Sequence, residues 1–331
     1  MTRTITYRDA LTEALREELE RDPAVLVMGE DVGAFGGAFG VTDGLQAAFG
    51  PARVRDMPIS ENAIVGLGIG AAMNGLRPVV ELMSVNFALL AFDQIVNHAA
   101  QIRAMFGGQV RVPLVLRMPQ GGGRRLGPMH SHSWEALFLH VPGLLVATPS
   151  MPADAKGLLK AAIRAGDPVV FLEHEGLYGV RGPVPDAADQ DDVVPFGRAI
   201  VRRPGTDVTV VGVSRMALVA WRAAEALARD DGIEAEVIDP RTLRPLDLDT
   251  IVASVRRTGR CVVVEEGWPR GGVATTLATL VTEQAFDALR APVRRVTGAD
   301  VPMPYAAGLE RAALPDEAAV VRAVRETLAP R

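Results

Sequence analysis

Short apolar runs rich in β-branched residues alternate with longer amphipathic segments along this chain, and this alternation limits the fold more than any other feature. Leu11, Leu15 and Leu19, for example, recur at helical spacing before the apolar run at residues 25–28. Such alternation is typical of a mostly parallel β-sheet that helices cover on both faces. We predict strands at residues 25–28, 79–83, 112–118, 144–147 and 169–172, and helices at residues 7–21, 63–75, 87–106 and 152–165.

The same pattern restarts near residue 207 and predicts a second, smaller α/β domain. Before it lies a proline- and acid-rich stretch, residues 182–192, that has no apolar periodicity. The 331 residues also exceed the usual size of one domain. We therefore expect two doubly wound α/β domains, at residues 1–185 and 206–331, joined by a linker at residues 186–205. The second domain is expected to contain strands at residues 208–213, 235–238, 261–265 and 293–297, and helices at residues 216–228, 248–257, 273–289 and 316–328.

The composition indicates a folded globular protein and argues against several functions. Hydrophobic residues make up 48% of the chain and charged residues 23%, unlike a disordered protein. The net charge of -5 provides no basic surface for nucleic acid. The single cysteine, Cys261, lies in an apolar run, so it is expected to be buried in a protein of a reducing compartment. Because the sequence has no signal core and no membrane-spanning apolar run, we expect a cytoplasmic, bacterial protein with no membrane partner.

Glu61 is the first candidate for a chemical role. It stands in the polar turn Pro58-Ile59-Ser60-Glu61-Asn62, before a small-sided apolar segment, and is therefore expected to be about half buried. Burial disfavours the charged form of a carboxyl group, which could then stay protonated near neutral pH and donate a hydrogen bond to a basic ligand atom. The alternative is that Glu61 only begins a helix, where an acid suits the helix dipole.

Two glycine-rich loops are further candidates. The loop at residues 29–40 contains two acids and follows an expected strand, so its backbone is expected to approach a ligand or a partner chain. Its spacing matches neither a dinucleotide fingerprint nor a Walker loop. The loop at residues 119–135 contains His130 and His132, whose spacing is a poor zinc signature. A loop histidine suits proton transfer, and an ordinary polar surface loop is the alternative.

Several motifs, in an order that extends from about Thr6 to the last helix, resemble those of one family: the beta subunit of the decarboxylating, first component of 2-oxoacid dehydrogenase complexes. The segment at residues 297–305 and Glu266-Gly267-Trp268-Pro269 resemble the pyruvate dehydrogenase type more than the branched-chain type. The other motifs are Pro58-Ile59-Ser60-Glu61, Gly70-Ala71-Ala72, Gly75-Leu76-Arg77-Pro78, Asn86-Phe87, Phe92-Asp93-Gln94-Ile95-Val96-Asn97, His130-Ser131, His140-Val141-Pro142-Gly143 and Asp154-Ala155-Lys156-Gly157-Leu158.

The resemblance implies a transketolase-like fold, with a thiamine-diphosphate-binding pyrimidine domain and a transketolase C-terminal-like domain. It also implies that two chains share thiamine diphosphate. An alpha subunit would hold the diphosphate and magnesium, and the beta subunit would hold the aminopyrimidine. The sequence lacks the Gly-Asp-Gly motif that the family uses for the diphosphate, in agreement with this division. The resemblance therefore implies a heterotetramer of two alpha and two beta subunits.

The resemblance also implies roles for four residues. Glu61 would hydrogen-bond the ring nitrogen of the aminopyrimidine and favour its imino tautomer, which removes the proton from the thiazolium carbon. Phe87 and Met83 would pack against the pyrimidine. His130 would face the lipoyl group of a dihydrolipoyl acyltransferase and protonate its leaving thiolate.

Two features depart from the family pattern. The family usually has Gln where this chain has His132, which affects the hydrogen bonding around His130. Several members bind a structural potassium ion, for which the corresponding residues here are Leu114, Ala162 and Asp167. In the loop at residues 162–167, Ala165 replaces an acid that the family has. The resemblance therefore leaves open whether this chain binds potassium.

The resemblance implies a pyruvate dehydrogenase beta subunit that is active only with its alpha subunit. Its reaction would be the thiamine-dependent oxidative decarboxylation of pyruvate and the reductive acetylation of lipoyl groups. The closest alternative is the same role with acetoin or branched-chain 2-oxoacids. A non-catalytic scaffold subunit is a third alternative, against which Glu61 and His130 argue. A self-sufficient transketolase-like enzyme would need a longer chain that includes the diphosphate motif.

Overall fold

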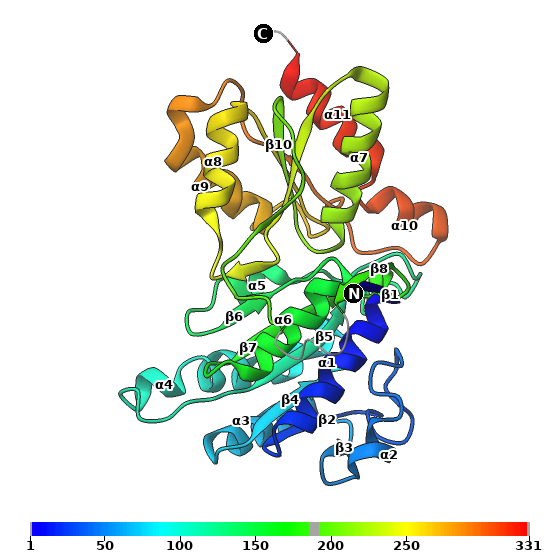
Figure 1. Cartoon of the computed structure of the whole chain (residues 1–331), viewed down its shortest axis with the longest axis vertical. Coiled ribbons are helices and arrows are strands. Elements are labelled where there is room, and N and C mark those ends of the chain that lie inside the picture. The colour runs from blue at the N-terminus through cyan, green and yellow to red at the C-terminus, as the bar shows by residue number, and fades with distance from the viewer. Residues whose placement is uncertain (1, 186–191, 330–331) are drawn as a thin grey trace. The chain divides into compact units, whose positions relative to one another are not determined.

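A computed structural model describes residues 2–185 and 192–329, and the chain divides into two compact units (Figure 1). The first unit comprises residues 1–120 and 137–196, and the second comprises residues 121–136 and 197–331. The domain ranges expected from the sequence differ from these units at residues 121–136, which the second unit contains. The expected linker contains the strand β9 (Ile200–Arg203), while its residues 186–191 lie outside the described residues.

The first unit contains a parallel sheet with the strand order β6-β7-β5-β4-β2-β3. Most residues of these strands are buried, as expected for a sheet covered on both faces. The doubly wound fold predicted from the alternating pattern is therefore confirmed. The strands are β2 (Val25–Gly29), β3 (Val54–Asp56), β4 (Arg77–Glu81), β5 (Val115–Gln120), β6 (Leu145–Ala147) and β7 (Val169–His174), and a separate antiparallel pair joins β1 (Thr2–Thr6) to β8 (Arg181–Pro185).

Local signals explain where the first helix, α1 (Tyr7–Arg21), begins and ends. The Thr6 hydroxyl accepts a hydrogen bond from the Asp9 N–H at 3.0 Å, and Asp22 has extended backbone angles. The apolar face of α1 is buried, and the helix packs on α6 (Pro152–Arg164). Besides the helical segment at residues 85–105, the other helices before β8 are α2 (Leu45–Phe49), α3 (Glu61–Met73), α5 (Glu135–Leu139) and the short 3₁₀ helix η3 (Glu175–Leu177).

The single long helix predicted at residues 87–106 is wrong. The segment consists of a 3₁₀ helix, η1 (Val85–Ala91), a π-helix, η2 (Gln94–Ala99), and one turn of α-helix, α4 (Ile102–Met105). One side chain contacts the backbone here, because the His98 ring lies 3.3 Å from the Asp93 carbonyl oxygen, an acceptor that a regular α-helix would use within its own ladder. π-Helical segments are rare in proteins, and those that occur are often found at functional sites.

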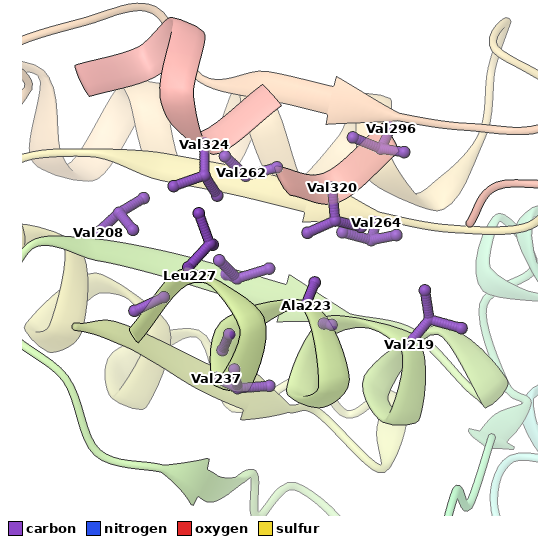
Figure 2. Close-up of a cluster of buried hydrophobic side chains, with 14 of the residues drawn as sticks. Val208, Val219, Ala223, Leu227, Val237, Val262, Val264, Val296, Val320 and Val324 are labelled. Atoms are coloured by element: carbon purple, nitrogen blue, oxygen red, sulfur yellow. The ribbon is translucent and has the colours of Figure 1, made fainter. Parts of the chain in front are cut away.

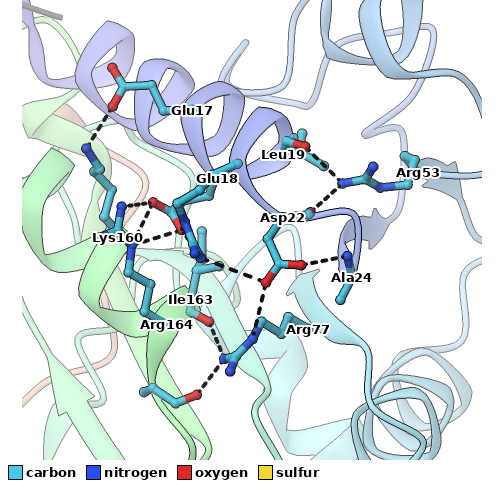
Figure 3. A network of polar contacts seen from close by, with 12 residues as sticks. Glu17, Glu18, Leu19, Asp22, Ala24, Arg53, Arg77, Lys160, Ile163 and Arg164 are labelled. Carbon is cyan, nitrogen blue, oxygen red and sulfur yellow. Dashed lines mark hydrogen bonds and ion pairs between the residues drawn. The ribbon is translucent and has the colours of Figure 1, made fainter. Parts of the chain in front are cut away.

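Buried ion pairs join α1 to α6 (Figure 3). The Glu17 carboxylate accepts hydrogen bonds from Lys156 at 2.6 Å and from Lys160 at 2.8 Å, and both lysines are almost fully buried. Burial alone would raise the pKa of Glu17, but the hydrogen bonds and charges of the two lysines hold this pKa below its usual value. The ionised form of Glu17 therefore stabilises the fold.

We expect Glu17→Gln to lower the free energy of unfolding by about 1–3 kcal/mol at pH 7, since it removes hydrogen bonds between charged groups. A carboxyl with a depressed folded pKa contributes stability above its unfolded pKa of about 4.3 and loses this contribution as the pH falls through the folded value. The difference from wild type should therefore shrink below pH 4 in urea titrations. Glu20→Gln, at an exposed position of α1, is the control. A loss that is independent of pH would contradict this interpretation.

The second unit contains a five-stranded sheet with the order β14-β13-β10-β11-β9, in which only β9 is antiparallel to its neighbour. Valines from the sheet pack against α7 (Arg215–Asp231) and α11 (Glu317–Leu328) in one core (Figure 2). Helices α8 (Leu248–Thr258) and α9 (Val273–Ala285) pack together and contact strands of the same sheet (Figure 1). The remaining elements are β10 (Val208–Gly212), β11 (Ala235–Asp239), β12 (Thr242–Arg244), β13 (Cys261–Val264), β14 (Arg294–Val296), the 3₁₀ helix η4 (Phe286–Ala288) and α10 (Ala307–Ala313).

Cys261 is fully buried, as predicted, and burial raises the pKa of its thiol to about 12. Within the described ranges, the helices are too short or too polar to cross a bilayer.

Candidate functional site

The order of the strands in the first unit reverses between β2 and β4. From β2 the chain passes to β3 on one side, and α3 then returns it to β4 on the other side of β2. In open α/β sheets, ligands bind at such a switch point, outside the carboxyl ends of the strands. Glu30 follows the carboxyl end of β2, Glu61 follows β3 after a short turn, and Met83 follows β4. The fold therefore places three candidate residues at the ligand-binding edge of this sheet.

Glu61 is the first residue of α3 and is only 5% exposed. The side chain is thus more deeply buried than the sequence predicts. Its position also agrees with the simpler interpretation of Glu61 as a residue that begins a helix. Across residues 2–185 and 192–329, however, its carboxylate has no hydrogen-bond or ion-pair partner. Its oxygens are also not among the buried side-chain atoms that lack a partner, so the carboxylate keeps access to solvent and can be reached by a ligand.

Glu30 is a further candidate residue that was not predicted from the sequence. Its side chain is 8% exposed, and its Oε1 atom is buried without a hydrogen-bond partner in the described part of the chain. Burial, and then the negative charges of Glu61 and Asp31, raise the pKa of Glu30. Asp31 has a positive φ of 56°, a strained conformation for a residue other than glycine. The two acids in the glycine-rich loop were the signal in the sequence.

Met83 and Phe87 are both half-buried in the segment that follows β4. The Ser84 hydroxyl accepts a hydrogen bond from the Asn86 N–H at 3.4 Å, and the Phe87 N–H donates to the Ser84 carbonyl at 3.0 Å. These bonds begin η1, and η1 packs on α3, the helix that Glu61 begins. The partial exposure of Met83 and Phe87 leaves apolar surface on which a flat ring could pack. The roles of these two residues toward a pyrimidine stay predictions.

His130 belongs to the second unit, whereas Glu61, Met83 and Phe87 belong to the first. The side chain of His130 is exposed. His132, which stands in place of the family's Gln, stacks on Trp134 with ring centroids 4.7 Å apart and lies 4.9 Å from the Trp268 ring. Burial lowers the pKa of His132, so this ring favours its neutral form. The role of His130 in proton transfer stays a prediction.

The residues named for potassium already take part in contacts within the first unit. The Leu114 carbonyl accepts a hydrogen bond from the Val169 N–H at 2.8 Å, and the Ala162 carbonyl accepts one from the Ala165 N–H at 3.2 Å. Arg103 donates to both carboxylate oxygens of Asp167, at 2.6 and 2.7 Å. The potassium site therefore stays a prediction. In the described ranges, no group of three or more His, Cys, Asp or Glu residues could hold a metal ion.

A buried charged cluster lies beside the switch point and was not predicted. Arg117 in β5 forms ion pairs with Glu81 at the end of β4 and with Glu173 in β7, and all three side chains are almost fully buried. The Tyr178 hydroxyl also donates to Glu173 at 2.7 Å. Burial raises the pKa of Glu81 in spite of the charge of Arg117. The cluster joins the three neighbouring strands β4, β5 and β7.

Comparisons with known proteins agree with this architecture. A family model described as the transketolase pyrimidine-binding domain matches residues 3–181, and one for the transketolase C-terminal domain matches residues 197–320. The chain is 51% identical to the mitochondrial pyruvate dehydrogenase E1 component subunit beta-1 of Arabidopsis thaliana, over 96% of this chain and 88% of the relative. It is 48% identical to the pyruvate dehydrogenase E1 component subunit beta of Rickettsia felis, over 97% of this chain and 98% of the relative.

Another similar protein is the pyruvate dehydrogenase E1 component subunit beta of Rhizobium meliloti, with 50% identity over 97% of this chain and 69% of the relative. Among solved structures, the chain resembles a split-gene transketolase described as an inactive beta4 tetramer. The TM-score is 0.78 and the sequence identity 25%, with 98% of each chain covered. The transketolase-like two-domain fold implied by the sequence resemblance is therefore confirmed.

Proposed function

The chain belongs to the family of pyruvate dehydrogenase E1 component beta subunits, and on this premise we propose that it acts with an alpha subunit to decarboxylate pyruvate and acetylate lipoyl groups. One observation carries the proposal. Glu61 is a nearly buried carboxyl at the carboxyl edge of the sheet, and its carboxylate has no partner in the described part of the chain. Such a group is suited to hold a proton at a nitrogen atom of a bound cofactor.

Thiamine diphosphate, when bound, supplies the nucleophilic carbon and accepts the electrons that decarboxylation releases. Glu61 would hold a proton at the aminopyrimidine ring nitrogen and so favour the imino tautomer. Met83 and Phe87 would cover the pyrimidine and exclude water from it. We assign the diphosphate and magnesium sites to the alpha subunit, because this sequence lacks the Gly-Asp-Gly motif. The assembly would contain two alpha and two beta subunits.

His130 would act in the second half of the reaction, on the lipoyl group of a dihydrolipoyl acyltransferase. An exposed histidine can protonate the thiolate that leaves when the lipoyl disulfide is opened. The lipoyl domain and the acyltransferase are therefore the proposed macromolecular partners besides the alpha subunit. The predicted cytoplasmic location stays a prediction.

A comparison of substrates tests the proposed activity. The assembled enzyme should show a higher kcat/KM for pyruvate than for acetoin or for branched-chain 2-oxoacids, each measured under identical cofactor concentrations. A higher value for either of the other substrates would assign this chain to that related complex. A complex that binds the lipoyl domain and the alpha subunit but turns over none of the three substrates would indicate the scaffold alternative.

A further inference from the structure

Residues 121–132 form a loop of the second unit whose ends are joined by a backbone hydrogen bond. The Gly121 N–H donates to the His132 carbonyl at 2.8 Å. Within the loop, the His130 N–H donates to the Gly127 carbonyl at 3.3 Å, so His130 ends a tight turn. The loop thus presents its exposed histidine close to the point where its two ends meet.

The carboxylate of Glu266, just after β13, holds the two ends of this loop. Its Oε1 atom accepts hydrogen bonds from the Gly122 N–H at 2.7 Å and from the Ser133 hydroxyl at 3.1 Å. Glu266 is 8% exposed, and Arg215 lies 3.5 Å from its other oxygen. Hydrogen bonds to an ionised acceptor are roughly twice as strong as neutral ones, so Glu266 fixes both ends of the loop.

A second carboxylate, Glu310 in α10, holds the first half of the loop. Its Oε1 atom accepts hydrogen bonds from the N–H groups of Gly123 at 3.1 Å and Arg125 at 2.8 Å. Glu310 is only 2% exposed. Arg125 has a positive φ of 60°, which a residue with a side chain adopts only where its surroundings impose it. The Arg125 N–H bonds to Glu310 in this conformation, so Glu310 stabilises the loop at a strained residue.

Aromatic side chains also pack against this loop. A side chain at Gly127, where φ is 74°, would collide with the ring of Tyr305, so the turn before His130 rests on that ring. His132 lies between Trp134 and Trp268 on the side that follows His130. The residues on both sides of His130 are therefore fixed, while the His130 side chain itself is exposed.

We propose that Glu310 and Glu266 are positioning residues, which hold the loop so that His130 meets the lipoyl group during acetyl transfer. The inference rests on the proposed function, because it concerns the step assigned to His130. A loop without these two anchors would sample many backbone conformations and place His130 correctly in only a fraction of them. A misplacement of about 1 Å at a reacting group costs up to about 10²-fold in rate.

The test uses the complete alpha-beta complex with Glu310→Ala and Glu310→Gln. The matched control is Glu317→Ala, which removes an exposed carboxylate 3.6 Å from Arg222 in the same unit. Two rates are compared: the acetylation of a free lipoyl domain, and the oxidation of pyruvate by ferricyanide, which needs no lipoyl group. Glu310→Ala should lower the first rate at least about tenfold more than the second. Glu310→Gln should lie between Glu310→Ala and wild type, because a neutral oxygen can still accept both hydrogen bonds.

Amide hydrogen exchange provides a readout that does not depend on turnover. Exchange in residues 121–132 should be faster in Glu310→Ala than in wild type, since two amide hydrogen bonds are lost. The Glu317→Ala control should leave both the exchange and the ratio of the two rates at wild-type values.

A double-mutant cycle shows if Glu310 acts through His130. Glu310→Ala should have little effect on lipoyl acetylation when His130→Ala is already present, because the two residues serve one step. The positioning role would be overturned if the rate losses of Glu310→Ala and His130→Ala were additive, or if Glu310→Ala slowed both reactions equally. Either result would leave the proposed function intact. The proposed function itself would be overturned if the wild-type complex failed to oxidise pyruvate both with ferricyanide and with the lipoyl domain.

Discussion

Glu61→Gln is expected to reduce pyruvate turnover by the assembled enzyme about 10²- to 10⁴-fold, the contribution of a positioned acid-base group. The amide has nearly the same shape as the carboxyl, but it cannot hold or release a proton at the cofactor nitrogen. The measurement is the steady-state release of carbon dioxide with saturating thiamine diphosphate. Glu20→Gln, on the exposed side of α1, removes a carboxylate of the same unit and should leave the rate unchanged.

The same substitution should not destabilise the fold. Glu61 has no partner to lose within the described ranges, and its charge helps to raise the pKa of the buried Glu30. Because the folded protein raises the pKa of Glu30, ionisation of Glu30 lowers the stability of the fold as the pH rises above the pKa that Glu30 has in the unfolded chain. Removing the Glu61 charge should therefore leave the thermal unfolding temperature at pH 8 equal to wild type or higher. A large activity loss together with a lower unfolding temperature would favour a structural role for Glu61.

Arg117→Met is expected to have the largest effect on stability, a loss of about 3–5 kcal/mol in the free energy of unfolding. The substitution leaves Glu81 and Glu173 buried without the cation that now pairs with both. The pKa of Glu81, which burial already raises, should rise further in the variant. Because such a carboxyl destabilises the fold above its unfolded pKa, the loss should be larger at pH 8 than at pH 5.

Urea titrations at the two pH values measure this effect. The matched control is Arg103→Met, whose ion pair with Asp167 is partly exposed and should contribute less than about 1 kcal/mol. Equal losses for the two arginine variants would contradict the importance assigned to the buried cluster. A loss that is equal at both pH values would contradict its electrostatic origin.

The sequence predicts elements well where the signals are local. α1 begins at Tyr7 and ends at Arg21 as expected, because its apolar spacing lies within the helix and Thr6 and Asp22-Pro23 directly flank it. The burial of Cys261 was likewise evident from the valines that follow it. The predicted helix at residues 87–106 failed because apolar spacing does not distinguish one continuous α-helix from successive 3₁₀, π and α segments.

Part of the candidate site depends on contacts that no local pattern reveals. Glu61 was predicted from the change between a polar turn and an apolar helix, which places it at the edge of the core. Glu310 lies far along the chain from the loop that it holds and follows an ordinary helical pattern. Arg117 lies in an apolar strand, and its partners come from neighbouring strands that the sequence does not align. Long-range pairing of this kind becomes visible only in the folded sheet.

The decisive measurement is carbon dioxide release from pyruvate by this chain mixed with its candidate alpha subunit, with and without thiamine diphosphate, and with each chain alone as a control. We predict turnover only in the mixture that contains thiamine diphosphate, because the two chains would each hold a different part of the cofactor. Turnover by this chain alone, or a stable alpha-beta complex that releases no carbon dioxide from pyruvate, would contradict a shared site built around Glu61.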